Sequence, residues 1–144
     1  MSTNDEVGKR LLEYGVKPSL QRIAIMEYLM DSIMHPTVDV IFNDLHPSVP
    51  TLSKTTVYNT LKLLEEQGAI RSITLDDKNL RYDADLSCHA HFKCKQCGCL
   101  CDIPLHDSAA FEIKNPGDFI LTECQVYYKG YCKQCKDLFI HNIN

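Results

Sequence analysis

The tetrapeptide Cys-Lys-Gln-Cys occurs twice in this chain, at residues 94–97 and at residues 132–135. Each copy presents two thiols from one tight turn, and two such turns supply the four sulfurs of a tetrahedral Zn²⁺ site. Gly98 directly follows the first copy, which suits a turn whose backbone closely approaches a metal. We therefore predict a structural Zn²⁺. Its ligands are Cys94, Cys97, Cys132 and Cys135.

A redox dithiol of the thioredoxin kind is the alternative interpretation, because that chemistry also uses Cys-x-x-Cys. It uses a single pair beside a β-α-β unit, however, and the sequence shows no such pattern. Four cysteines lie outside the two pairs, and each is most simply a small buried apolar residue. These are Cys88, Cys99, Cys101 and Cys124. Cys99 and Cys101 alternate, as residues on one face of a strand do.

The distribution of cysteines divides the chain. All eight lie at or after Cys88, and the 144 residues, 44% of them hydrophobic, suffice for two small domains. We therefore predict domains over residues 1–84 and 85–144. The charged N-terminus lacks the apolar core of a signal peptide, and no apolar run is long enough to span a membrane. We expect a soluble cytoplasmic protein with no membrane partner, whose cysteines are metal ligands or reactive thiols.

The first domain shows helical periodicity followed by a hairpin. Residues 19–34 have an apolar stripe of Leu20, Ile23, Met26, Met30 and Ile33, with Ser19 as the N-cap. Residues 37–46 predict a shorter helix with Val38, Ile41 and Leu45 on one side, and residues 53–67 predict a third with Val57, Leu61 and Leu64. Gly68 suits the end of that third helix. "AIRSITL", the turn "DDKN" and "LRYDAD" then form a hairpin. This order is typical of a winged helix-turn-helix.

The second domain reads as mixed α and β. "PLHDSAAFEIK" predicts one short helix, "FILTECQVYY" predicts a strand, and "CKQCKDLFIH" predicts a last helical turn or two. The overall expectation is an α+β protein. Its net charge of −4 gives no general electrostatic argument for nucleic-acid binding, so any DNA interface must be a local motif.

A second group of potential ligands lies beside the first cysteine pair. His89 and His91 share one face if they lie on a strand, and Asp83 and Asp102 flank them in the sequence. Two imidazoles and two carboxylates suit Fe²⁺ or Mn²⁺ better than an all-sulfur site does, although Zn²⁺ also binds such a set. Spacing alone leaves open that these histidines are surface residues. His35, taken alone, is most simply a surface histidine.

Three stretches together resemble the ferric uptake regulator (Fur) family of bacterial metalloregulators. They are "TLSKTTVYNTLKLLEEQGAI", "RYDADLSCHAHFKCKQCGCLCDIP" and "GYCKQC". The resemblance covers nearly the whole chain and implies a winged-helix DNA-binding domain followed by an α/β dimerisation domain with a structural zinc. It also implies a homodimer that binds a double-stranded, pseudo-palindromic DNA operator as a repressor. The positions that match the family's five-ligand regulatory site are His35, Asp83, His89, His91 and Asp102.

The acidic residues of that site favour one branch of the family. Zinc-sensing members often carry cysteine at the Asp83 position, and iron-sensing members more often carry glutamate at both acidic positions. Peroxide-sensing, PerR-like members carry aspartate at the Asp102 position, and Asn59 after Tyr58 is also closer to that branch. The resemblance therefore implies a peroxide sensor with Fe²⁺ or Mn²⁺ at the regulatory site, with iron or zinc sensing as alternatives. The four extra cysteines depart from the family pattern and leave thiol or haem chemistry open.

The predicted third helix supplies the candidate DNA-reading face. Its polar residues lie away from the Val57 seam, and Asn59 suits a base edge while Thr55 and Tyr58 suit a thymine. Lys17 matches a position from which the family reaches the minor groove, and Arg22 suits a phosphate. The full set is Lys17, Arg22, Lys54, Thr55, Tyr58, Asn59 and Lys62. A metal- or thiol-dependent enzyme is the alternative of a different class, but no phosphate loop or nucleophile elbow supports it.

Overall fold

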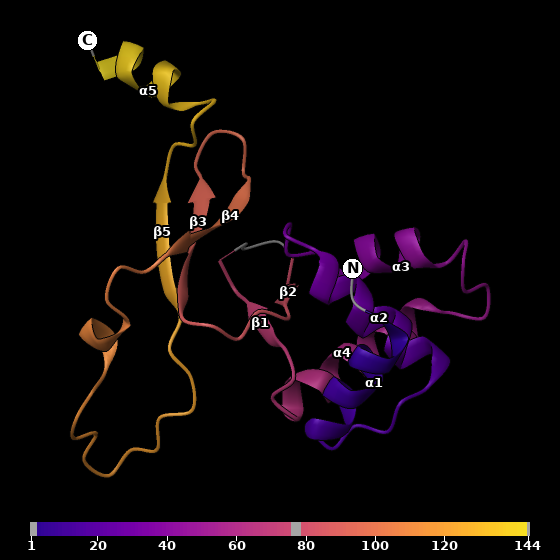
Figure 1. Ribbon diagram of the computed structural model, residues 1–144. Coiled ribbons are helices and arrows are strands. Elements are labelled where there is room, and N and C mark those ends of the chain that lie inside the picture. The colour runs from indigo at the N-terminus through magenta and orange to yellow at the C-terminus, as the bar shows by residue number, and fades with distance from the viewer. Residues whose placement is uncertain (1–2, 76–78, 144) are drawn as a thin grey trace. The chain divides into compact units, whose positions relative to one another are not determined.

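The computed structural model describes residues 3–75 and 79–143 (Figure 1). The chain forms two units, Met1–Leu86 and Ser87–Asn144. The functional division predicted at residue 84 stays a prediction. Both helices and strands occur, so the predicted α+β class is confirmed. Within the described part of the chain, no helix is long and apolar enough to cross a membrane.

The described residues of unit 1 form four helices and a two-stranded hairpin, and a hydroxyl side chain caps the start of each of these helices. Ser19, the predicted N-cap, accepts a hydrogen bond from the Arg22 backbone N–H at 3.2 Å. Thr3, Thr37 and Ser53 act in the same way for the other three helices. The elements are α1 (Asn4–Glu13), α2 (Leu20–Asp31), α3 (Val38–Leu45), α4 (Lys54–Glu66), β1 (Arg71–Ile73) and β2 (Arg81–Asp83). Helix α1 was not predicted from the sequence.

The core of unit 1 gathers one face of each helix. The predicted seam of α4 is fully buried, and Ile41 of α3 is buried as well. The predicted stripe of α2 is wrong in part. Leu20 is 75% exposed and Ile33, which lies beyond the end of the helix, is 80% exposed. The buried face is Ile25, Met26 and Leu29. Apolar residues occupy most positions of α2, so its periodicity is compatible with more than one face.

Helix α4 ends in a Schellman turn at the predicted glycine. Gly68 has a φ of +79°. Its N–H donates to Glu65 O at 3.0 Å, and the Ala69 N–H donates to Leu64 O at 2.8 Å. The chain then enters the hairpin, in which β1 and β2 are antiparallel with Arg71 opposite Asp83. The predicted turn of this hairpin falls largely on residues 76–78, outside the described residues.

Unit 2 is built on a three-stranded sheet of order β4-β3-β5, whose strands lie side by side in Figure 1. Strand β4 is antiparallel to β3, and β5 is parallel to it. The short helix predicted after residue 103 is a single 3₁₀ turn, and the predicted final helix is present. The elements are β3 (His89–Cys94), β4 (Leu100–Pro104), η1 (Ser108–Phe111), β5 (Val126–Gly130) and α5 (Lys136–Ile143).

The strand predicted over residues 119–128 is correct only at its end. Strand β5 begins at Val126, which pairs with Ala90. Because β3 begins one residue before Ala90, the register leaves the segment 119–123 beyond the end of β3. The β-branched and aromatic composition of that segment indicated a strand, but β3, the strand it would pair with, does not extend far enough toward its N-terminus.

Two glycines of unit 1 should respond to alanine with opposite signs. Gly68 needs a left-handed conformation, so Gly68→Ala should cost about 1–2 kcal/mol of the free energy of unfolding. Gly8 lies within α1, and a Cβ there meets nothing within 4 Å, so Gly8→Ala should stabilise the protein by about 0.5–1 kcal/mol. Urea denaturation measures both changes. Changes of the same sign would contradict the turn described for Gly68.

Candidate metal centres

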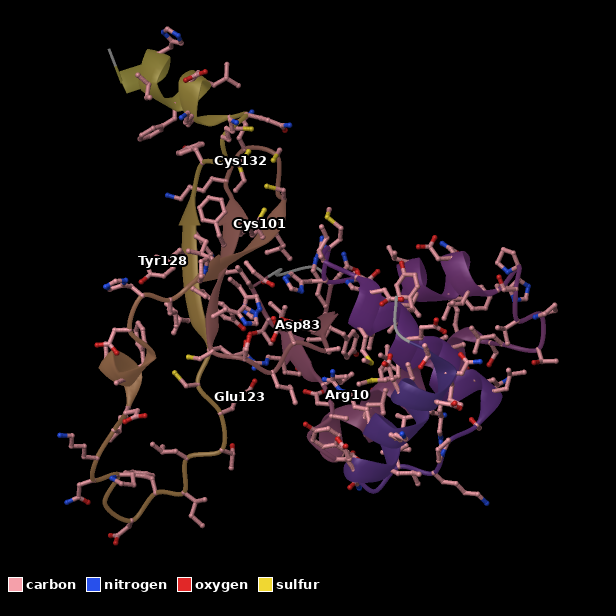
Figure 2. The ribbon with its side chains drawn as sticks, viewed as in Figure 1. Arg10, Asp83, Cys101, Glu123, Tyr128 and Cys132 are labelled. Atoms are coloured by element: carbon pink, nitrogen blue, oxygen red, sulfur yellow. The ribbon has the colours of Figure 1, made fainter. Side chains whose placement is uncertain are left out.

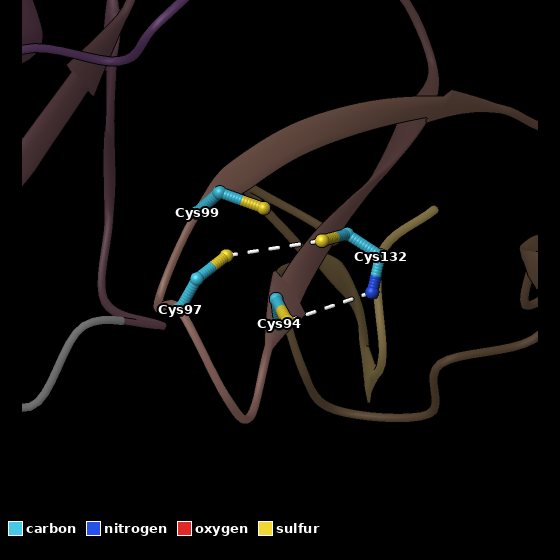
Figure 3. A group of neighbouring side chains, drawn as sticks. All are labelled: Cys94, Cys97, Cys99 and Cys132. Atoms are coloured by element: carbon cyan, nitrogen blue, oxygen red, sulfur yellow. Dashed lines mark hydrogen bonds between the residues drawn. The ribbon is translucent and has the colours of Figure 1, made fainter. Parts of the chain in front are cut away.

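Four cysteine sulfurs of unit 2 converge on one point (Figure 3). They belong to Cys94, Cys97, Cys99 and Cys132, and all lie within 4.8 Å of one another. The Cys97 and Cys132 sulfurs are 3.8 Å apart. Zn–S bonds of about 2.3 Å in a tetrahedron place sulfurs about 3.8 Å apart. The donor type and the spacing of this group therefore both fit Zn²⁺.

Backbone hydrogen bonds shape the turn that carries the first cysteine pair. The Cys94 N–H donates to Cys99 O at 3.0 Å, and the Gly98 N–H donates to Cys94 O at 3.0 Å. Gly98 adopts a φ of +75°, which glycine adopts at little cost. From the second pair, the Cys132 N–H points to the Cys94 sulfur at 3.5 Å, as Figure 3 shows. Residues of the two pairs thus lie close together, and the zinc ligand set stays a prediction.

Cys135 differs from the other three predicted zinc ligands. It lies outside the group of four, where Cys99 takes a place, although it is buried at the same location. A hydrogen bond with the Cys132 thiol, burial, and further bonds with Cys94 and Cys97 raise the pKa of Cys135 to about 12. The N–H of Cys97, by contrast, lowers the pKa of Cys94 to about 6. Binding of a metal by these thiols would release their protons, because the thiolate is the ligand.

The remaining cysteines are not the small buried residues expected from the sequence. Cys88, Cys101 and Cys124 are exposed, so that interpretation is wrong for these three. Cys99 is half-buried, and burial raises the pKa of its thiol well above the usual range. Figure 2 shows Cys101 on β4 and Cys132 beyond the end of β5. The sequence gave no signal that Cys99 joins the sulfur group, because that contact depends on the register of the paired strands.

Two histidines and one aspartate form a second group in unit 2. His89 and His91 lie on β3, and Asp102 lies on β4 directly opposite His91. The two Nε2 atoms are 3.1 Å apart, and they lie 3.5 Å and 3.6 Å from Asp102 Oδ1. Ligands about 2.1 Å from a metal, at tetrahedral or octahedral angles, are about 3.0–3.4 Å apart. The three donor atoms are therefore spaced nearly as ligands of one divalent ion.

The backbone orients the His89 ring. His89 Nδ1 lies 2.8 Å from Ser87 O, and a carbonyl only accepts, so Nδ1 carries the proton and donates it. The Nε2 atom of His89 then has a lone pair directed at His91 and Asp102. Fixing the tautomer through the other ring nitrogen is the usual preparation of a histidine metal ligand.

His35 and Asp83 form a buried pair in unit 1. His35 Nδ1 lies 3.8 Å from Asp83 Oδ2, and the two side chains are 2% and 5% exposed. The interpretation of His35 as a surface histidine, made from its local sequence alone, is therefore wrong. Its φ of 50° is unusual for a residue other than glycine, and Arg81 on β2 donates to its carbonyl at 3.4 Å. Figure 2 shows Asp83, which ends β2.

The predicted DNA-reading residues lie on accessible surface of unit 1. Six of the seven are exposed, and Arg22 is half-buried. Arg22 donates to Lys17 O at 2.8 Å and so holds the loop that carries Lys17. Lys54 instead pairs with Asp39 at 3.2 Å on the surface. A groove between the start of α2 and α4 is lined by residues that include Lys17, Arg22 and Asn59.

A helical unit that ends in a β-hairpin, joined to a small unit with clustered metal-ligand side chains, defines a winged-helix metalloregulator. The profile of the "Ferric uptake regulator family" matches residues 13–129. The "Peroxide-responsive repressor PerR" of Staphylococcus epidermidis is 35% identical over 129 residues, which cover 88% of this chain and 86% of the relative. The chain belongs to the ferric uptake regulator family, whose members are regulators rather than enzymes.

Solved structures agree with this assignment. The peroxide stress regulator of Campylobacter jejuni is 25% identical with a TM-score of 0.63, covering 94% of this chain and 100% of that one. The ferric uptake regulator Fur of Helicobacter pylori has a TM-score of 0.68 at 22% identity, covering 94% of this chain and 95% of that one, and shows the shared fold. The predicted winged helix followed by a small α/β domain is thereby confirmed.

Proposed function

We propose that the protein is a peroxide-sensing transcriptional repressor that binds an operator as a homodimer when Fe²⁺ or Mn²⁺ occupies its His/Asp site. The observation that carries this proposal is the convergence of His89, His91 and Asp102, with the His89 tautomer fixed by Ser87. Nitrogen and carboxylate donors suit Fe²⁺ and Mn²⁺. A structural Zn²⁺ bound through the cysteine pairs accompanies it, since the sulfur spacing fits that ion.

The regulatory metal is proposed to draw ligands from both units of the chain. The family resemblance assigns His35 and Asp83 of unit 1 to the same ion as the three ligands of unit 2. Within unit 1 this pair is already together and buried. An ion bound by all five ligands would favour one arrangement of the units over others, because it binds that arrangement more tightly. DNA affinity would then follow metal occupancy.

The choice of peroxide rests on the acidic ligands and on the relatives. Both acidic positions hold aspartate, and the matched repressor of Staphylococcus epidermidis is peroxide-responsive. Bound Fe²⁺ would supply the one electron that cleaves the O–O bond of a peroxide, and the oxidant so formed would oxidise a nearby imidazole. His35 and His89 are the proposed targets. Loss of one imidazole ligand weakens the metal site, so DNA would be released.

Metal-dependent DNA binding and its loss on oxidation form the first test. In anaerobic titrations, Fe²⁺ and Mn²⁺ should both promote binding to an AT-rich pseudo-palindromic operator. Peroxide should abolish binding of the Fe²⁺ form only. Intact-mass and peptide analysis should then show one added oxygen on a peptide that contains His35 or His89. Oxidation confined to cysteines would refute peroxide sensing, and an iron-dependent response without oxidation would indicate iron sensing.

A ligand variant and a matched histidine variant sharpen this test. His91→Ala removes a buried nitrogen ligand, so it should weaken Fe²⁺ and Mn²⁺ binding strongly. Loss of a residue that only hydrogen-bonds a metal ligand costs about 10–100-fold in metal affinity, and loss of a ligand itself should cost at least as much. His106→Ala removes an exposed histidine outside the group and should leave metal binding unchanged. Zinc content should be the same in both variants, because the sulfur site does not use either residue.

The proposed DNA interface is the exposed face of α4 with the adjacent groove. A helix in the major groove reads base edges with side chains near its exposed N-terminal half. Thr55, Tyr58 and Asn59 occupy that half of α4 and are exposed. Lys62 lies one turn further on and suits a phosphate. The Lys54–Asp39 pair would have to open for Lys54 to reach DNA.

Two substitutions should separate base reading from phosphate binding. Asn59→Ala should cost about 1–3 kcal/mol on the operator and relax specificity at one base pair. Lys62→Ala should weaken binding to all sequences alike and lower the salt slope of binding by about 1. Lys9→Ala removes the same charge from exposed surface on α1 and serves as the control. Fluorescence anisotropy at several salt concentrations measures these changes; equal losses in all three variants would refute the interface.

A homodimer is proposed because unit 2 exposes much apolar surface. Ile120 is 90% exposed and Phe119 is 75% exposed, and the two are neighbours in an apolar stretch of the sequence. Ile113, Leu121 and three apolar residues of α5 are also largely exposed. Contiguous exposed apolar residues mark association surfaces in soluble proteins. A second copy of the chain is the proposed partner, as the family resemblance implies.

A charge within that apolar surface should weaken the dimer. Ile120→Asp would bury a carboxylate on association, so the dimer dissociation constant should rise more than about tenfold, the equivalent of 1.4 kcal/mol. Leu12→Asp places the same charge at a 62% exposed position on α1 in unit 1 and should have no effect. Sedimentation equilibrium measures both constants. An unchanged dimer with Ile120→Asp would show that residue 120 lies outside the interface.

A further inference from the structure

Five thiols surround a position where a tetrahedral ion accepts four. Cys94, Cys97, Cys99 and Cys132 converge within 4.8 Å, and Cys135 contacts three of them through hydrogen bonds of its thiol. Structural Zn²⁺ is four-coordinate. One thiol is therefore in excess, and Cys99 and Cys135 are the two that compete for the last position.

Strand pairing holds Cys99 at the site. Strands β3 and β4 pair with Lys93 opposite Leu100, so the next step of the register places Cys94 opposite Cys99. The hydrogen bond from the Cys94 N–H to Cys99 O continues that pairing. Directly opposite residues of an antiparallel pair project to the same face, with Cβ atoms about 4.5–5.5 Å apart. The thiol of Cys99 thus belongs to the same rigid hairpin as two zinc-ligand thiols.

Cys135 is held differently. It immediately precedes α5, and its N–H donates to Cys132 O at 3.0 Å within the turn that leads into the helix. The ring of Tyr131 stacks on Phe139 of α5 with centroids 4.4 Å apart. Cys135 is therefore connected to the C-terminal helix, whereas Cys99 is part of the sheet.

We propose that Cys99 is an alternative zinc ligand, which replaces Cys135 in the coordination sphere while Cys94, Cys97 and Cys132 remain bound. This inference rests on the structural Zn²⁺ of the proposed function. In the exchange, the Zn–S bond to Cys135 breaks and one to Cys99 forms. The proton of the Cys99 thiol passes to the Cys135 thiolate, so charge and electrons balance without any oxidant. Zinc is retained while Cys135 and the start of α5 lose their attachment to it.

Zinc retention by serine variants of the full-length chain tests the exchange. Cys99→Ser and Cys135→Ser should each keep one zinc per chain after dialysis against a chelator, because the other thiol completes the site. The double variant should lose it, because only three thiols then remain at the site. Cys124→Ser removes an exposed cysteine outside the group and should retain zinc. The metal is quantified by mass spectrometry.

The outcomes separate this inference from the proposed zinc site itself. If Cys135→Ser loses zinc as completely as the double variant does, or if the double variant keeps zinc as well as Cys135→Ser does, Cys99 is not a ligand. A wild-type chain that holds no zinc would overturn both the inference and that part of the proposed function. Cobalt substitution adds a spectroscopic reading. Cys135→Ser should keep the four-thiolate charge-transfer band of the wild type, and the double variant should show at most about three quarters of it, because only three of the four sulfurs remain.

A measurement on the unmodified chain keeps the inference testable if a variant does not fold. The zinc-loaded protein is treated briefly with iodoacetamide, and molecules that retain zinc are mapped by mass spectrometry. Labels should occur on Cys99 in some molecules and on Cys135 in others, never on both together. Exclusive labelling of Cys99, with Cys135 fully protected, would overturn the exchange.

Discussion

The antiparallel register between β3 and β4 determines both candidate metal centres. It places Asp102 opposite His91 in the middle of the paired strands and continues to Cys94 opposite Cys99 next to the hairpin turn. A slip of one residue would turn each of these side chains to the opposite face. The histidine group and the sulfur group therefore form together or not at all. The turn at Gly98 fixes the register, since its φ of +75° and its hydrogen bond to Cys94 close the hairpin there.

The same strand keeps two kinds of metal chemistry apart. His91 and Cys94 both lie on β3, three residues apart, which separates them by about 10 Å along the strand. Soft thiolates and imidazole–carboxylate sets prefer different ions, so a metal bound in one group gains little from the other. A structural ion and an exchangeable ion can then occupy one small unit without competing for ligands. In the proposed function, this separation allows metal sensing without loss of the zinc that supports the fold.

Much of the fold was predictable because its signals are local. The seam of α4, its glycine end, the N-cap of α2 and the placement of His89 and His91 on one strand all follow from periodicity and capping. The predictions that failed concern features that depend on contacts between residues far apart in the sequence. The buried face of α2 depends on its neighbours, and the start of β5 depends on where β3 begins. The burial of His35 requires the fold of unit 1, and its local sequence gave no sign of it. Cys99 was missed because only strand pairing brings it to Cys94.

The two units differ in how far their own cores can stabilise them. Unit 1 buries a continuous cluster from Val7 to Ala84, whereas the described residues of unit 2 bury only Ala90, Cys94, Leu100 and Cys135 among hydrophobic side chains. Two of those four are cysteines of the sulfur site. A chain segment of this size is marginal without additional stabilisation, and structural zinc contributes about 10–16 kcal/mol of apparent binding energy in small zinc peptides. In the proposed function, zinc and coverage of its apolar surface supply this additional stabilisation of unit 2. That contribution of zinc explains why a thiol that keeps zinc bound, even as another leaves, has structural value in this unit.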